Sequence, residues 1–272
     1  MTLRASKLVL TFTFLLAAAA AGRVVYSGQG MSGYGNVVVL KHGEDWSTVY
    51  AHNRENRAQV GEVANVILVA SGKGGVGKST TAVNLALALA AEGASVGMLD
   101  ADIYGPSQPM MLGITGHPES ADGQSMEPME GHGLQVMSIG FLVGPDQAMI
   151  WRGPMATQAL EQLLRQTNWG ELDYLLVDMP PGTGDIALTL SQRVPLTGAV
   201  IVTTPQDIAL IDARKGLKMF EKVGIPILGI VENMSIHICS KCGHEEHVFG
   251  AGGGQRLAHQ YEAPFLGSLP LD

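Results

Sequence analysis

One short stretch, SGKGGVGKST at residues 71–80, constrains the fold of this 272-residue chain more than any other. It follows a continuous apolar run, Val66–Ala70, and precedes an Ala- and Leu-rich stretch, Ser79–Glu92, that stops at Gly93. A strand, a Gly-x-x-x-x-Gly-Lys-Ser loop and a helix in this order form a P-loop, whose backbone N–H groups face the phosphates of a nucleotide. We therefore predict a nucleoside triphosphate site after a strand that is buried on both faces.

The P-loop residues have distinct expected roles. Lys78 is expected to reach the β- and γ-phosphates, and the Ser79 hydroxyl to ligate Mg²⁺. Lys73 is unusual, because most P-loops have no second lysine at this place, and the residues alone also allow a solvated surface lysine. The complete predicted nucleotide-binding loop is Gly72, Lys73, Gly74, Gly75, Val76, Gly77, Lys78, Ser79 and Thr80.

Two further apolar runs end in carboxylates. Ser95–Asp100 leads into Asp102, and Tyr174–Asp178 ends in Asp178. Ligands of open parallel sheets bind beyond the carboxyl ends of the strands, so we expect these side chains to converge on the P-loop. Asp178 suits the Walker B role of holding Mg²⁺ directly or through water, and Asp102 suits orientation of the attacking water. For Asp100 and Asp185 a helix N-cap is the alternative.

The apolar runs predict an α/β fold, a doubly wound and mostly parallel sheet of the P-loop NTPase type. Pro154 is expected at a helix start and Asp207 as a helix cap. The stretch Gly116–Gly133 is predicted to be a mobile loop. The expected strands are Val66–Ala70, Ser95–Asp100, Gln135–Ile139, Tyr174–Asp178, Gly198–Thr203, Ile227–Glu232 and Phe265–Leu269.

The first 64 residues differ from the rest in charge and pattern. Residues 1–64 carry six Lys/Arg and four Asp/Glu, whereas residues 65–272 carry eleven and twenty-one. Residues 1–22 have a basic start and an apolar run shorter than the roughly 20 residues that span a bilayer, which is typical of a secretory signal peptide; an apolar core helix is the alternative. Residues 23–64 contain short β-branched runs between glycines and predict a β-rich piece with antiparallel pairing.

Part of this N-terminal segment resembles a known fold. Residues 23–64, with YAHN at Tyr50–Asn53, resemble a stretch of the LytM-type zinc endopeptidases and their inactive cell-division relatives. That fold takes its zinc ligands from an upstream His-x-x-x-Asp and a downstream His-x-His, and neither motif is present. His42 and His52 alone cannot form a three-ligand site, so we interpret the segment as a fragment without peptidase activity, from a gene fusion or misassembly.

The two cysteines of the chain lie in one motif, Cys239-Ser240-Lys241-Cys242. Two thiolates cannot complete a [4Fe–4S] site that needs four, but two copies of the chain supply four. The spacing leaves zinc open as well, because His237, His244 and His247 lie close by and Cys₂His₂ is a common structural set. A redox Cys-x-x-Cys is a further alternative, although the motif lacks its usual place at a helix start, and the spacing argues against plain core cysteines.

Several motifs in residues 65–272 together indicate a family. KGGVGKST resembles the deviant Walker A motif of the MinD/ParA/nitrogenase-iron-protein class. DADIYGPSQP, WRGPM, VDMPPGTGD, TTPQDIALIDARKG and GIVENMS resemble the Mrp/ApbC iron–sulfur cluster carriers. The resemblance implies a homodimer that binds ATP, Mg²⁺ and a [4Fe–4S] cluster at the subunit interface, hydrolyses ATP slowly, and passes the cluster to apo iron–sulfur proteins.

The same resemblance assigns residues. It implies that Lys73 reaches the partner's nucleotide, that Asn233 recognises adenine and that Asp102 is the switch carboxylate, with Lys73, Lys78 and Asp102 forming the catalytic set. Gly182–Asp185 would form the second switch. The resemblance also favours the cluster over zinc at Cys239 and Cys242.

Two further functions stay open, and the location is in conflict. A MinD/ParA-type positioning ATPase predicts an amphipathic C-terminal helix or a basic patch, and an exported envelope protein with a vestigial P-loop rests on residues 1–64 alone. The formal net charge of −8 argues against a nucleic-acid partner, and no membrane partner is expected. We expect a cytoplasmic protein, because a periplasm has no ATP pool and oxidises thiolates. In this family a small α+β domain often precedes the P-loop domain and a closing helical segment follows it, so we expect residues 65–272 to be truncated at the C-terminus.

Overall fold

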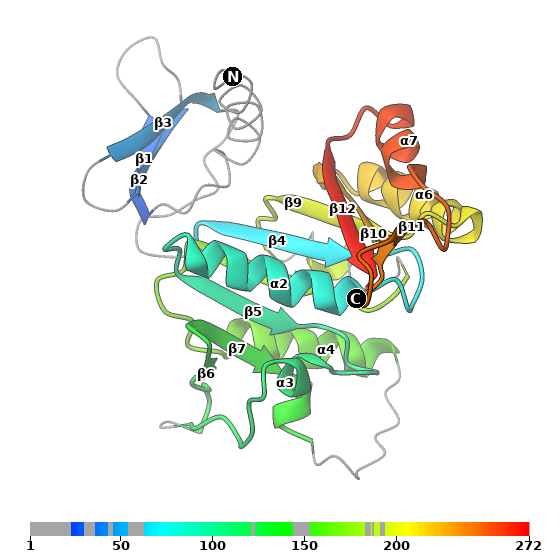
Figure 1. Cartoon of the computed structure of the whole chain (residues 1–272). Coiled ribbons are helices and arrows are strands. Elements are labelled where there is room, and N and C mark those ends of the chain that lie inside the picture. Colours follow the sequence, from blue (N-terminus) through cyan, green and yellow to red (C-terminus); the bar gives the residue numbers. More distant parts are fainter. Residues whose placement is uncertain are drawn as a thin grey trace.

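A computed structural model describes residues 63–120, 123–143, 153–182, 186, 188–190 and 194–271, together with three N-terminal strands. These three strands, β1 (Arg23–Gln29), β2 (Asn36–His42) and β3 (Trp46–Asn53), form an antiparallel sheet of their own (Figure 1). The antiparallel pairing predicted for residues 23–64 is therefore confirmed. The signal-like residues 1–22 lie outside the described part.

A second, mostly parallel sheet carries the P-loop. Its order is β6-β7-β5-β8-β4-β9-β10-β11, with β12 also paired to β10, and β6 and β11 are its antiparallel members. The seven strands expected from the sequence are all present and pair with one another in parallel. The strands are β4 (Asn65–Ala70), β5 (Val96–Asp100), β6 (Met129–Gly131), β7 (Leu134–Ser138), β8 (Tyr174–Asp178), β9 (Gly198–Thr203), β10 (Ile227–Ile238), β11 (Glu245–Glu246) and β12 (Phe265–Leu271).

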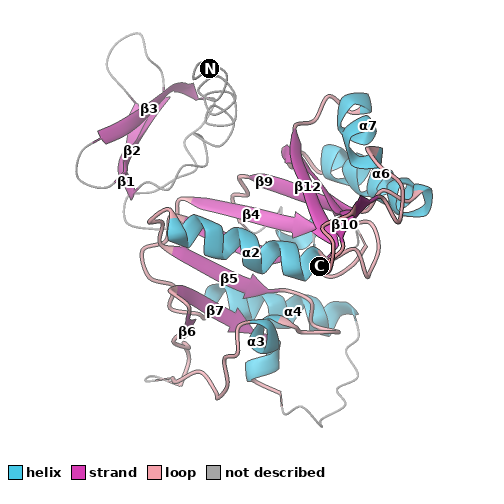
Figure 2. Cartoon of the chain, in the orientation of Figure 1, coloured by secondary structure: helices cyan, strands magenta, loops and turns pink. Residues whose placement is uncertain are grey.

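Helices cover the sheet on both sides (Figure 2). In this view α2 (Lys78–Ala91) lies in front of the sheet and α4 (Gly153–Arg165) lies behind it. Helix α6 (Asp207–Lys222) packs on β9 and β10, and α7 (Gly253–Gln260) packs on β10 and β12. The central strands β4, β5 and β8 are almost completely buried, as a sheet covered on both faces requires. The predicted doubly wound α/β fold is confirmed.

Strand register brings the predicted carboxylates beside the P-loop. Strand β8 lies between β4 and β5, with Asp178 opposite Val69 on one side and opposite Asp100 on the other. The P-loop follows β4 directly, so the carboxyl ends of three neighbouring strands meet at one edge of the sheet. This is the place where open parallel sheets bind ligands.

Two local expectations need correction. Part of the Gly116–Gly133 stretch is a strand, because β6 pairs with β7 through the two-residue turn His132-Gly133. Both turn residues have positive φ, 55° and 78°, which is the backbone of a type I′ hairpin. Asp207 does not cap α6: Gln206 is the cap residue, and Asp207 lies in the first turn, where its charge favours the helix dipole. The other local predictions agree, since Gly93 follows the end of α2 with φ 94° and Pro154 lies in the first turn of α4.

In the described part of the chain, no helix combines the length and apolar character needed to cross a bilayer.

Candidate functional site

The P-loop is held at both ends by packing. Gly77 is the N-cap of α2 with φ 80°, a left-handed conformation that favours glycine, and an added Cβ there would clash with the Asn233 amide of β10. At the other end, Gly72 lies against the backbone of α6, where an added Cβ would clash with the carbonyl group of Asp212. The loop is therefore held closely between β10 and α6.

Lys78 and Asp178 form the centre of the site. The Lys78 ammonium is paired with Oδ1 of Asp178, and both side chains are buried. Lys78 also donates to the Ser79 hydroxyl at 3.2 Å. The structure thus brings together the predicted phosphate-binding lysine, the predicted Mg²⁺-binding hydroxyl and the Walker B carboxylate.

Asp102 lies at the edge of this centre. Burial raises the pKa of its carboxyl, the Asp178 charge raises it further, and the Lys78 charge opposes both. An aspartate that senses both partners of the central ion pair is well placed for the predicted switch role, which stays a prediction.

The sequence allowed two roles for Asp100, as a residue of the nucleotide site or as a helix cap. In the structure it has the second role. Its Oδ2 accepts hydrogen bonds from the backbone N–H groups of Ser107 and Gln108 and from the Ser138 hydroxyl. These two N–H groups open the short helix α3 (Gln108–Met111), so Asp100 caps α3 from a neighbouring strand. Burial, followed by repulsion from Asp178, raises the pKa of Asp100 to about 6.

The raised pKa of Asp100 makes a testable prediction about stability. The folded state holds the Asp100 proton more tightly than the unfolded chain, so the contribution of this group is full below pH 3.8 and is lost as the pH rises from there to about 6. The total loss amounts to about 3 kcal/mol, of which about 2 kcal/mol falls above pH 4.5. We therefore expect wild type to lose stability relative to Asp100→Asn between pH 4.5 and pH 7.5, measured by urea unfolding. A stability difference independent of pH would contradict the assignment.

The other predicted P-loop partners lie where the motif requires. Asn233 is buried at the end of the β10–β9 pairing, and its side-chain N–H donates to the Val76 carbonyl oxygen at 2.9 Å. Its predicted role in adenine recognition is not tested by this contact. Lys73 is half-buried and forms no ion pair within the described residues, while Gly74, Gly75 and Thr80 are exposed. Of the predicted second switch only Gly182 is described, and its N–H donates to Ser71; residues 183–185 lie outside the described part.

Cys239 and Cys242 lie in a tight exposed turn between β10 and β11. The Gly243 N–H donates to the Cys239 carbonyl oxygen at 2.8 Å, and the Cys239 N–H donates to that of His244 at 2.9 Å. The Cys239 sulfur accepts hydrogen bonds from the N–H groups of Lys241 and Cys242, with the Cys242 thiol also in reach, and these contacts lower the pKa of the Cys239 thiol. Both thiols are free, and every residue of 241–250 is exposed. The turn therefore presents two neighbouring sulfur atoms to a partner.

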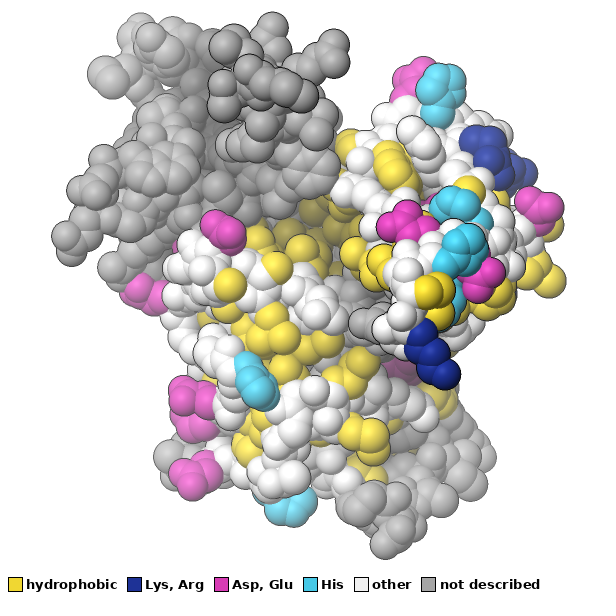
Figure 3. All heavy atoms as spheres, in the orientation of Figure 1, with side chains coloured by type: hydrophobic (Ala, Val, Ile, Leu, Met, Phe, Trp, Pro, Cys, Tyr) yellow, Lys and Arg dark blue, Asp and Glu magenta, His cyan; other side chains and the backbone are white. Residues whose placement is uncertain are grey.

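Within the described part of one chain, the surroundings of the turn do not complete a zinc site. Across the described residues, no group of three or more His, Cys, Asp or Glu side chains is close enough to hold a metal ion. His247, one of the predicted alternative ligands, uses Nδ1 for a 2.6 Å hydrogen bond with the Ser235 carbonyl oxygen. Histidine, acidic and hydrophobic side chains instead lie interspersed on the surface of this C-terminal part (Figure 3).

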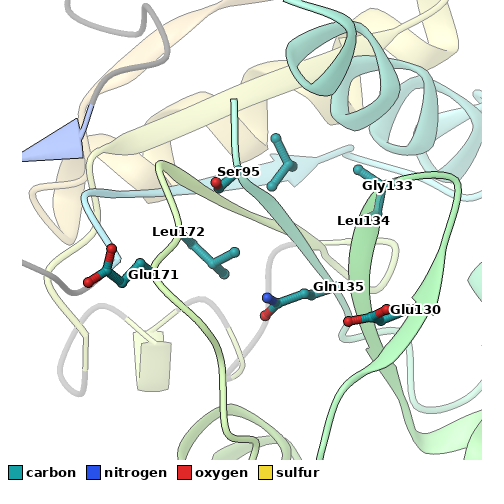
Figure 4. A pocket seen from close by; sticks show the side chains of 8 residues that line it. Ser95, Glu130, Gly133, Leu134, Gln135, Glu171 and Leu172 are labelled. Carbon is teal, nitrogen blue, oxygen red and sulfur yellow. The ribbon is translucent and has the colours of Figure 1, made fainter. Parts of the chain in front are cut away.

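A separate cavity lies far from the P-loop along the strands. It has a volume of about 250 Å³ and is lined by residues at the beginnings of β5, β7 and β8, among them Ser95, Leu134 and Leu172 (Figure 4). The P-loop follows the carboxyl end of β4, at the opposite edge of the sheet. This cavity is therefore distinct from the nucleotide site.

Two buried polar residues of the site were not singled out from the sequence. Gln108 contacts both Ser79 and Asp178, although it stands inside the DADIYGPSQP motif. Glu232 is fully buried and accepts from the N–H groups of Gly252 and Gly254, which fixes the start of α7 to β10. The signal that Glu232 offered is a carboxylate directly after the apolar run Ile227–Val231.

Comparison with known proteins identifies the family. The family model ParA, described as the NUBPL iron-transfer P-loop NTPase, matches residues 62–272. The chain belongs to this family. The Mrp/ApbC resemblance found in the motifs is thereby confirmed.

Relatives of the ParA/NUBPL family are highly similar to this chain. An iron-sulfur cluster carrier protein of Salmonella typhimurium is 62% identical over 232 residues, which is 84% of this chain and 63% of the relative. The protein of the same description from Escherichia coli K12 is 65% identical, over 80% of this chain and 59% of its own length. An iron-sulfur cluster transfer protein NUBPL of Mus musculus is 57% identical, over 77% of this chain and 66% of its own length. The chain thus spans about six tenths of the bacterial relatives.

Solved structures agree with the fold. A nucleotide-binding protein of Archaeoglobus fulgidus in complex with ADP has a TM-score of 0.68 and 41% identity, over 77% of this chain and 83% of that one. A MinD cell division ATPase of Pyrococcus furiosus, with a TM-score of 0.53 and 23% identity over 76% and 84%, shares the fold. At the N-terminus, the model of peptidase family M23 matches residues 15–85, the region of the endopeptidase-like segment.

Proposed function

We propose that this chain is an ATP-dependent carrier of iron–sulfur clusters. The observation that carries the proposal is the exposed Cys239/Cys242 turn at the end of β10, the strand whose Asn233 contacts the P-loop. One strand thus connects a nucleotide site with a pair of accessible thiols. The names of the relatives, which are cluster carrier and transfer proteins, support the same function.

The nucleotide half of the mechanism follows from the central ion pair. Lys78 has to leave Asp178 and turn to the β- and γ-phosphates, which frees a carboxylate oxygen beside the Ser79 hydroxyl. A freed carboxylate and a hydroxyl are hard oxygen donors that fit Mg²⁺, so Ser79 and Asp178 would hold it. The ion would neutralise phosphate charge during hydrolysis. Asp102 then orients the attacking water, and Lys73 is available to a second subunit.

The cluster half requires two copies of the chain. One turn supplies two thiolates, and a homodimer supplies the four that a [4Fe–4S] cluster needs. The cluster is the cargo, which passes to apo iron–sulfur proteins when nucleotide status changes the dimer. Because a cluster carrier of this kind needs reduced thiols and ATP, the proposal includes a cytoplasmic location.

The test is anaerobic reconstitution of the whole chain with iron and sulfide, followed by iron counting, visible absorption and transfer to an apo-ferredoxin with and without ATP. We expect about four iron atoms per dimer and ATP-dependent transfer. Zinc retained without a cluster chromophore would overturn the carrier function and would favour the alternative, a MinD/ParA-type positioning ATPase.

A further inference from the structure

Gln108 is a polar residue in the most buried part of the nucleotide site. Its side chain is completely buried, which is uncommon for a glutamine without a specific role. Its own backbone N–H donates to the buried carboxylate of Asp100 at 3.1 Å, so the start of α3 is anchored beside the P-loop. This backbone hydrogen bond fixes the place from which the Gln108 side chain enters the site.

The carboxamide of Gln108 joins the two residues expected to hold Mg²⁺. Its Nε2 donates to Oδ2 of Asp178 at 2.8 Å and to the Ser79 carbonyl oxygen at 3.2 Å. Both neighbours are acceptors, which fixes the orientation of the amide and uses both of its hydrogens. The amide oxygen Oε1 is buried and has no hydrogen-bond donor among the described residues.

An unpartnered buried acceptor needs an explanation, because buried polar atoms are almost always hydrogen-bonded. The two residues that Gln108 contacts are those that surround the expected Mg²⁺. Mg²⁺ keeps several water molecules when it binds to proteins, and each of these waters is a hydrogen-bond donor. A metal-bound water is thus the type of donor that Oε1 lacks.

We propose that Gln108 positions the magnesium site of this chain: its Nε2 holds Asp178 after Lys78 has turned to the phosphates, and its Oε1 accepts a hydrogen bond from a metal-bound water. The inference rests on the proposed nucleotide function and adds a residue to it. In the ligand-free arrangement the two oxygens of Asp178 are shared between Lys78 and Gln108. When Lys78 departs, Gln108 would keep the Asp178 carboxylate from rotating and leave Oδ1 available to hold the metal.

The test compares ADP binding with and without Mg²⁺, by calorimetry, in wild type and in Gln108→Met. Methionine keeps the length and the burial of the side chain and removes both hydrogen-bonding groups. Loss of a group that orients metal ligands typically weakens metal affinity about 10- to 100-fold, so we expect the Mg²⁺-dependent gain in ADP affinity to fall by at least about tenfold. ADP affinity in EDTA should fall less than ADP affinity with Mg²⁺. Met110→Leu, an exposed change in the same helix, is the matched control.

The outcomes separate this inference from the proposed function. An unchanged Mg²⁺-dependent gain in ADP affinity in Gln108→Met would overturn the inference. Equal losses of ADP affinity with and without Mg²⁺ would show that Gln108 only stabilises the local structure, and would overturn it as well. If Gln108→Met does not fold, Gln108→Asn, whose amide is one methylene too short to reach both partners, is read by the same criteria. Failure of wild type itself to bind ADP would instead contradict the proposed nucleotide function.

Discussion

Lys78→Ala should both destabilise the fold and weaken ATP binding. Lys78 is the cation paired with the fully buried Asp178, and removal of one partner from a buried pair typically costs about 3–5 kcal/mol. The same change removes a charge-assisted contact to the phosphates, worth about 1.5–3 kcal/mol or about 10- to 100-fold in affinity. Urea unfolding and calorimetry with ATP measure the two effects separately.

Lys73→Ala is the matched control, because Lys73 lies in the same loop, is only half-buried and pairs with no described carboxylate. We expect its stability to stay within about 0.5 kcal/mol of wild type. Its ATPase activity should nevertheless fall if Lys73 acts across the dimer. Equal stabilities of Lys78→Ala and wild type would show that the Lys78–Asp178 pair does not form in solution.

The central sheet could be predicted because its signals are local. A parallel strand covered on both faces is a nearly continuous apolar run, and Val66–Ala70 and Tyr174–Val177 show this directly. The signal of the P-loop is similarly local, since its glycines, lysine and serine are neighbours in the sequence. The convergence of Asp178 and Asp102 on this loop followed from a rule on parallel sheets and needed no coordinates.

The features that were missed or misjudged depend on tertiary contacts. The β6–β7 hairpin turns at His132-Gly133, and a non-glycine residue with positive φ gives a weaker turn signal than Asn-Gly. Gln108 follows no strand, and its importance appears only where α3 meets Ser79 and Asp178. The choice between zinc and cluster at the cysteine turn likewise depends on which further ligands gather around it in space, and spacing along the chain does not determine this.

The cysteine turn allows the second large effect to be tested. In Cys239→Ser/Cys242→Ser the chain keeps its fold, because residues 241–250 are exposed and the turn is closed by backbone hydrogen bonds. Serine hydroxyls do not replace thiolates as cluster ligands, so bound iron should fall from about four per dimer to none. Ser240→Ala, in the same turn, should retain the full iron content, and ATP binding should be equal in all three proteins.

Mixed dimers decide whether the cluster bridges two chains. If wild type and the double variant are unfolded together in equal amounts, refolded and reconstituted, only wild-type pairs supply four thiolates, so about a quarter of the dimers should carry a cluster. A metal held within one chain would instead fill about half of all subunits, since each wild-type chain would bind independently. Among the described residues of one chain, no third metal ligand lies close to Cys239 and Cys242. We therefore expect a cluster in about a quarter of the dimers. A half-filled sample would show that each chain completes its own site, with ligands from outside the described part, and would remove the reason for a shared cluster.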